Sequence, residues 1–77
     1  MRTAFIVNPV AGGGRALHAW RALEAEALRV CAPAEIVMTT GPGVAATLAC
    51  DVASRATRLV AVGGDGTFSE VLNGLMA

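Results

Sequence analysis

The 77-residue sequence predicts an α/β fold of three parallel strands between helices, in α/β/α layers. Three observations support this prediction. Short apolar runs alternate with longer stretches in which apolar residues recur every three or four positions, in the order βαβαβα. Each apolar run ends at a loop rich in glycine or proline. Strands that alternate with helices are parallel, so their exits to the following helices share the carboxyl edge of the sheet.

The first strand is expected over Thr3–Val7, where an unbroken apolar run suits a strand that is buried on both faces. It ends at Asn8-Pro9, because proline has no amide to donate within a central strand. Residues 10–14 form a glycine-rich loop, and a helix is expected over about 15–30, before Ala32-Pro33. The apolar stripe of this helix comprises Leu17, Trp20, Leu23, Ala27 and Val30.

The second strand is expected over Glu35–Thr39 and is followed by a turn over Thr40–Gly43, since Gly-Pro-Gly is a strong turn signal. A helix is then expected over about Val44–Ala56. Its apolar stripe comprises Val44, Leu48 and Val52.

The third strand is expected over Arg58–Val62 and runs directly into Gly63-Gly64-Asp65-Gly66-Thr67. The last helix is expected to begin near Phe68. Its apolar face, at the spacing i, i+3, i+4 and i+7, comprises Phe68, Val71, Leu72 and Leu75.

Composition narrows the classes of function. The six cations are all arginine, so lysine Schiff-base chemistry and a P-loop lysine are excluded. A formal net charge of zero argues against a nucleic-acid-binding module. No stretch resembles a membrane span or a signal peptide, so a cytoplasmic location is expected. Cys31 and Cys50 lack the spacing of zinc ligands and are expected to be buried thiols, with His18 in a packing or surface role.

Apolar residues make up 55% of the chain, which is more than a chain of this length easily buries. Either a partner covers the excess or the chain is part of something larger. We therefore expect self-association, through the edge of the third strand or through the third helix.

The first and third loops have the composition of a phosphate site. Glycines let a backbone approach an anion, and helix N-termini direct free N–H groups at it. Neither loop fits GxGxxG or Walker A, and a tight turn before a helix would use the same glycines. The residues alone leave both interpretations open.

Asp65 favours a nucleotide site, because a carboxylate between glycines suits a Mg²⁺ ion that bridges it to phosphate. The structural alternative is a helix N-cap. Thr67 and Glu70 have the spacing of a capping box, and Arg15 could contact phosphate or lie in solvent. Thr39, at the exit of the second strand, could contact a nucleotide.

Two motifs resemble the start of the diacylglycerol kinase-like catalytic domain, the family of bacterial lipid kinases and sphingosine kinases. They are Asn8-Pro9-Val10-Ala11-Gly12-Gly13-Gly14, and Gly63-Gly64-Asp65-Gly66-Thr67 followed by Phe68-Ser69-Glu70-Val71-Leu72-Asn73-Gly74-Leu75. The resemblance implies ATP and Mg²⁺ as cofactors, with the metal at Asp65. The implied nucleotide-binding residues are Asn8, Val10, Ala11, Gly12, Gly13, Gly14, Thr39, Gly64, Asp65, Gly66, Thr67, Ser69 and Glu70. Ser69 departs from the family, which usually has asparagine there.

The resemblance further implies transfer of the ATP γ-phosphate to a lipid hydroxyl, with diacylglycerol as the first candidate, by an enzyme in peripheral contact with a membrane. Residues 1–77 would be a truncated half-domain, the N-terminal part of the ATP-binding domain. The family's β-rich C-terminal domain, with its catalytic base, would be absent. The chain alone would then hold no catalytic residue and have no kinase activity.

The expected strand order is 2-1-3, which brings the Asn-Pro loop beside the Gly63–Thr67 loop. Two alternatives stay open. One is a fragment similar to NAD kinases, which share the Gly-Gly-Asp-Gly-Thr motif. The other is a non-catalytic, self-associating α/β module whose glycine loops are only turns.

Overall fold

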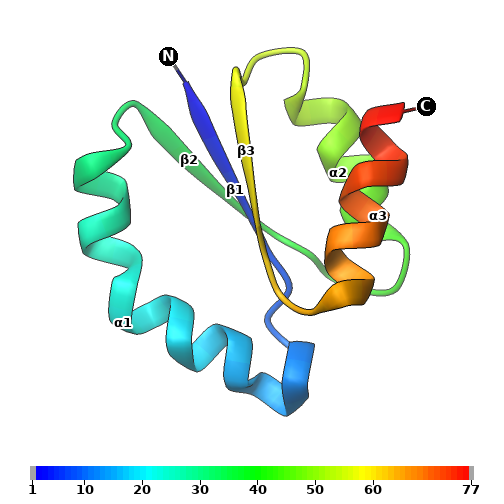
Figure 1. The fold of residues 1–77 in the computed structure, drawn as a ribbon, viewed down its shortest axis with the longest axis horizontal. Coiled ribbons are helices and arrows are strands. Elements are labelled where there is room, and N and C mark those ends of the chain that lie inside the picture. Colours follow the sequence, from blue (N-terminus) through cyan, green and yellow to red (C-terminus); the bar gives the residue numbers. More distant parts are fainter. Residues whose placement is uncertain (1, 77) are drawn as a thin grey trace.

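The computed structural model describes residues 2–76 and has the predicted architecture. Its elements are β1 (Thr3–Val7), α1 (Arg15–Val30), β2 (Ala34–Met38), α2 (Val44–Val52), β3 (Arg58–Val62) and α3 (Asp65–Met76), with a short 3₁₀ turn over Ala11–Gly14. The strands lie in the order β2-β1-β3, and both pairings are parallel. In Figure 1, α1 covers one face of the sheet and α2 and α3 cover the other. The expected α/β/α layers and strand order are confirmed.

The central strand β1 supplies a core to each face of the sheet, because successive side chains of a strand point to opposite faces. Phe5 and Val7 pack against Trp20 of α1, with the Phe5 and Trp20 ring centroids 4.9 Å apart. Ala4 and Ile6 point to the other face. There they meet Ala45, Ala49, Val52 and Val71 of α2 and α3.

The helices α2 and α3 pack very closely. A Cβ on Gly74 would lie 2.1 Å from the carbonyl oxygen of Ala46, so only glycine permits this approach. Helix α2 buries the small residues Ala45 and Ala49 together with Val52. The expected stripe of α2 is therefore wrong at Val44 and Leu48, which are only half-buried, and right at Val52.

Three expected boundaries shift. Strand β2 begins at Ala34 and ends before Thr39. Helix α2 ends at Val52 instead of near Ala56, where the Ser54 hydroxyl donates to the Asp51 carbonyl and competes with helical bonding. Helix α3 begins at Asp65 instead of near Phe68, because the Phe68 amide already donates to the carbonyl of Gly64.

Several large apolar side chains lie outside the core. On α1, Leu23 and Val30 are exposed, and Leu28 and Cys31 pack in their place. On α3, the close approach at Gly74 leaves Phe68, Leu72 and Leu75 at the side of the helix, 62%, 44% and 43% exposed. They line a shallow groove beside Leu59, Val60 and Ala61 of β3. Self-association through this groove stays a prediction.

The structure also tests the expectations for the cysteines and for a membrane span. Cys50 is exposed, so the expectation of two buried thiols is wrong for it, and Cys31 is half-buried. Within residues 2–76, no helix has the length and apolar character that a membrane crossing requires.

Candidate functional site

The exits of the three strands meet at one edge of the sheet. Val7, Met38 and Val62 are aligned across the sheet, so Asn8, Thr39 and Gly63 follow at the same level. Backbone hydrogen bonds continue past the strands: Asn8 N–H donates to Val62 O and Thr39 N–H donates to Val7 O, both at 2.9 Å. The carboxyl edge is where open parallel sheets bind ligands.

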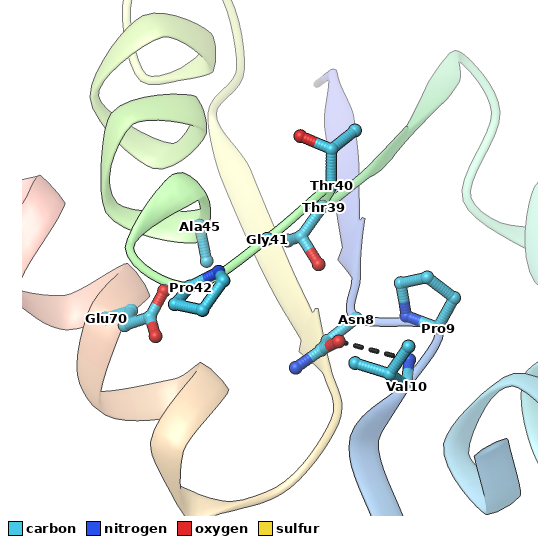
Figure 2. Close-up of a pocket in the computed structure, with 9 residues that line it drawn as sticks. All are labelled: Asn8, Pro9, Val10, Thr39, Thr40, Gly41, Pro42, Ala45 and Glu70. Carbon is cyan, nitrogen blue, oxygen red and sulfur yellow. Dashed lines mark hydrogen bonds between the residues drawn. The ribbon is translucent and has the colours of Figure 1, made fainter. Parts of the chain in front are cut away.

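A cavity of about 350 Å³ opens at this edge between the β1–α1 loop, the β2–α2 loop and α3. Its lining comprises Asn8, Pro9, Val10, Thr39, Thr40, Gly41, Pro42, Ala45 and Glu70 (Figure 2). The Thr39 hydroxyl points toward Asn8, whereas the Thr40 hydroxyl points away from it (Figure 2). Thr39 is 7% exposed, so its hydroxyl lies within the wall of the cavity.

The cavity brings together only some of the residues predicted from the sequence. Asn8, Val10, Thr39 and Glu70 line it. The remaining predicted residues lie outside its lining and belong to the two glycine loops and the start of α3. Sequence reasoning missed Pro9, Thr40, Gly41, Pro42 and Ala45 as lining residues. The Gly-Pro-Gly turn was the available signal, since it lies at the carboxyl edge.

The first glycine loop has a backbone conformation that residues with side chains rarely adopt. Gly12, Gly13 and Gly14 have φ angles of 63°, 68° and 97°, a run of left-handed residues before α1. No atom lies within 4 Å of a Cβ built on Gly13 or Gly14, so the loop is open to a ligand. Arg15 folds its side chain back on the loop, with Nε donating to the Gly12 carbonyl at 2.9 Å.

The second glycine loop is closed at one residue and open at two. A Cβ on Gly63 would lie 2.5 Å from Oγ1 of Thr67, whereas Cβ atoms on Gly64 and Gly66 would meet nothing within 4 Å. The exposed Asp65 lies in the first turn of α3, where the helix dipole favours a carboxylate. The loop therefore presents backbone and one carboxylate to solvent.

The expected capping box is wrong. Thr67 is the third residue of α3 and not the residue before it. Its hydroxyl accepts a hydrogen bond from Asn8 Nδ2 at 2.9 Å, and Glu70 lines the cavity. Thr67 thus bonds to Asn8 across the sheet edge instead of capping α3.

Asp65 is compatible with the predicted Mg²⁺ ion but does not form a metal site alone. Within residues 2–76, no three His, Cys, Asp or Glu side chains gather closely enough to hold a metal. No hydrogen bond or ion pair between described residues engages the Asp65 carboxylate. Mg²⁺ commonly takes one or two carboxylates and completes its shell with phosphate oxygens and water. The donor set therefore fits a nucleotide-bound ion, and the metal stays a prediction.

Comparison with known proteins gives a consistent result. A model of the diacylglycerol kinase catalytic domain matches residues 2–77. The Bacillus subtilis (strain 168) protein named "Putative lipid kinase YtlR" is 36% identical over 75 residues, which is 92% of this chain and 24% of that protein.

Solved structures match as well. Two structures of proteins named as a "putative diacylglycerol kinase" from Bacillus anthracis str. Sterne superpose with TM-scores of 0.80 and 0.81, at 34% and 35% identity. They cover 95% and 96% of this chain, and 26% and 25% of theirs. The chain thus spans about a quarter of the length of these relatives. Since the family model matches nearly every residue and the fold agrees, the chain belongs to the diacylglycerol kinase catalytic domain family.

Proposed function

We propose that the protein carrying this chain is a lipid kinase that uses MgATP, with diacylglycerol as its first candidate acceptor. The observation that carries the proposal is a cavity of about 350 Å³ at the carboxyl edge, flanked by two open glycine loops that each lead into a helix. Family membership and relatives named as lipid kinases support the reaction class.

The cavity suits the neutral part of a nucleotide. Its lining is uncharged except for Glu70, whose carboxylate would repel a triphosphate. A base and its ribose offer hydrogen-bonding groups without charge, which the Thr39 hydroxyl and the backbone of the β2–α2 loop can meet. We therefore assign the nucleoside to the cavity and its phosphates to the glycine loops.

The glycine loops suit the phosphates. Gly13, Gly14, Gly64 and Gly66 have open space where a side chain would lie, and each loop leads into a helix. The Arg15 N–H at the start of α1 already donates to the carbonyls of Ala11 and Gly12, whereas α3 begins directly after Gly64 and leaves the N–H groups of its first turn without helical partners. Asp65 would hold Mg²⁺ against the phosphate oxygens. Bound there, the ion would neutralise charge that develops on the transferred phosphoryl group.

The groups that bind and deprotonate the lipid hydroxyl are assigned to another part of the enzyme. Phosphoryl transfer needs an oriented hydroxyl and a group that takes its proton. Asp65 and Glu70 are committed to the nucleotide in this proposal, so we assign the base to a part of the enzyme outside these residues. A lipid acceptor also requires peripheral contact with a membrane.

The test is titration of MgATP into the full-length protein that carries this sequence, followed by assay against a panel of lipids. Asp65→Asn should weaken MgATP binding at least tenfold, because it removes the metal-binding charge. Asp51→Asn is the matched control, since Asp51 is also an exposed helical carboxylate and pairs with Arg55, away from the cavity, so this variant should bind as the wild type does.

Each outcome distinguishes the candidates. Phosphorylation of diacylglycerol or another lipid supports the proposal. Phosphorylation of NAD with no lipid product would favour the kinase of a soluble nucleotide. A folded wild-type protein that binds no MgATP would favour the non-catalytic module.

A further inference from the structure

One side-chain hydrogen bond joins the two glycine loops. Asn8, which follows β1, donates through Nδ2 to Oγ1 of Thr67 in α3 at 2.9 Å. We infer that this bond positions the loops relative to each other, so that Asn8 and Thr67 are positioning residues for the nucleotide site. The inference rests on the proposed function and assigns these two side chains a different role from the nucleotide contact expected from the resemblance.

Asn8 is held on both sides. Its Oδ1 accepts the amide of Val10 at 3.2 Å, which fixes the start of the first glycine loop (Figure 2). Its own backbone N–H donates to Val62 at the end of β3. The carboxamide therefore connects the β1 exit, the first loop and α3, and two of its hydrogen-bonding groups already have protein partners.

Thr67 is locked between Asn8 and the backbone of the second loop. It is 4% exposed, so its side chain lies beneath the surface that a ligand would touch. Its Oγ1 and Cβ lie 2.5 Å and 2.8 Å from where a Cβ of Gly63 would be. Glycine at 63 thus lets the Thr67 side chain pack against the β3 exit while its hydroxyl accepts from Asn8.

This packing sets the first turn of α3. Gly64, Asp65 and Gly66 lie between Gly63 and Thr67, and open space lies where the side chains of the two glycines would be. Their orientation toward the first loop is held by the β3 ladder, by the helical bond from the Phe68 amide to the Gly64 carbonyl, and by the bond from Asn8. Of these, the bond from Asn8 is the one that reaches the first loop, so without it the exposed turn that is proposed to receive phosphate would lose its direct connection to that loop.

The experiment compares Thr67→Val, which keeps the shape and removes the hydroxyl, with Thr67→Ser, which keeps the hydroxyl. In the full-length protein, Thr67→Val should weaken MgATP binding about tenfold, the size expected for one broken hydrogen bond, and Thr67→Ser should largely restore it. Asn8→Ala should have an effect at least as large, because it also removes the bond that Oδ1 accepts from the Val10 amide. The double variant Asn8→Ala/Thr67→Val should bind no more weakly than the weaker single variant, because both remove the same bond.

Amide hydrogen exchange without nucleotide supplies a second readout. Thr67→Val and Asn8→Ala should both speed exchange at residues 10–14 and 64–68, and Thr67→Ser should not. A Thr67 that contacted ATP directly would instead give lower affinity with unchanged exchange and additive losses in the double variant, and either result overturns the inference. If the wild-type protein binds no MgATP, the proposed function fails, and the exchange pattern still decides whether the bond joins the loops.

Discussion

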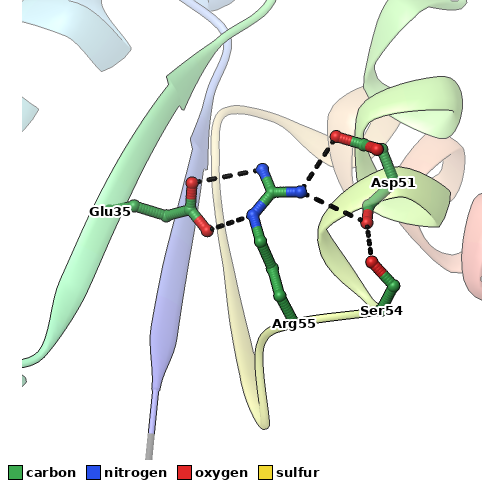
Figure 3. Close-up of polar contacts among 4 residues, drawn as sticks. All are labelled: Glu35, Asp51, Ser54 and Arg55. Carbon is green, nitrogen blue, oxygen red and sulfur yellow. Dashed lines mark hydrogen bonds and ion pairs between the residues drawn. The ribbon is translucent and has the colours of Figure 1, made fainter.

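The two ends of the sheet are built differently. At the amino end, side chains close the structure. Arg55 lies after α2 and reaches Glu35 of β2 with Nε–Oε1 and Nη2–Oε2 distances of 2.8 Å and 3.2 Å (Figure 3). Its Nη1 donates to Asp51 Oδ2 at 3.1 Å. The Arg55 guanidinium thereby links the edge strand β2 to the end of α2, which no backbone ladder joins.

The starts of β1 and β3 are joined in the same way. Oγ1 of Thr57 accepts the Arg2 amide at 3.0 Å and donates to the Arg2 carbonyl at 3.2 Å. Nε of Arg58 donates to Oγ1 of the buried Thr3 at 3.1 Å. Side chains from all three strands thus take part in closing this end.

The carboxyl end of the sheet has few contacts between side chains. Among the residues that the structure describes, one hydrogen bond between side chains crosses it, from Asn8 to Thr67. The loops that follow the strands contain glycines that face open space, namely Gly13, Gly14, Gly41, Gly43 and Gly64. The two ends therefore divide between stability and binding. Contacts at the amino end hold the layers together, so the carboxyl end can leave its backbone groups available to a ligand.

The largest test of this division uses two glycines of α3: Gly74, which packs against α2, and Gly66, which lies in the first turn at the carboxyl end. Gly74→Ala should lower the free energy of unfolding by about 2–3 kcal/mol, because its Cβ would overlap the Ala46 carbonyl and force α2 and α3 apart. Gly66→Ala should leave the free energy of unfolding the same or slightly higher, since its Cβ meets open space and alanine favours helix. Urea denaturation of both variants measures the difference.

In MgATP binding, Gly66→Ala should be the variant that loses affinity. A methyl group on Gly66 lies in the first turn of α3, so it should weaken MgATP binding although the fold is intact. Equal losses of stability in the two variants would show that the two ends do not differ as described.

A second pair of variants removes one hydroxyl at each end. Thr39→Val should weaken MgATP binding about tenfold with little loss of stability, since the Thr39 hydroxyl lines the cavity. Thr57→Val should lower the free energy of unfolding by about 1 kcal/mol, because it removes both hydrogen bonds to Arg2. Calorimetric titration and thermal unfolding of each variant separate the two effects, and a binding defect in Thr57→Val would contradict the division.

Most of the fold could be predicted from the sequence, for physical reasons that differ between elements. The bounds of β1, β3 and α1 agree with the expectation, because buried parallel strands are continuous apolar runs and Pro9 and Pro33 mark where elements end. The start of α3 was placed too late. Glycines 63, 64 and 66 indicated a loop, whereas the chain turns into helix directly after Gly64.

The site could be predicted only in part. Parallel topology alone places both glycine loops at one edge, so the location of the site followed from the order of the elements. The buried face of α3 could not be predicted from the sequence. Helical spacing favours Leu72 and Leu75 as buried residues and gives no sign that Gly74 would contact Ala46. Nor does spacing reveal that Asn8 and Thr67, which lie far apart in the sequence, share a hydrogen bond.

The smallest test concerns the ion pairs at the amino end. Arg55→Lys keeps the charge and loses the two-pronged contact with Glu35, so the melting temperature should fall slightly and MgATP affinity should not change. Arg29→Lys is the matched control, because Arg29 pairs with Glu26 inside α1 and connects no two elements. Arg55→Lys should therefore lower the melting temperature more than Arg29→Lys does.

Salt and pH sharpen this last comparison. High salt should shrink the effects of both variants, since all four side chains are partly or fully exposed. Glu35 first, and then Asp51, raise the pKa of Arg55 above its ordinary value. A raised pKa means that the contribution of Arg55 is complete below its ordinary pKa and is lost only as the pH rises through the raised one. The difference between wild type and Arg55→Lys should hence stay constant from neutral to mildly alkaline pH, and a difference that disappeared there would show that the two-pronged contact of Arg55 with Glu35 is not what joins β2 to α2.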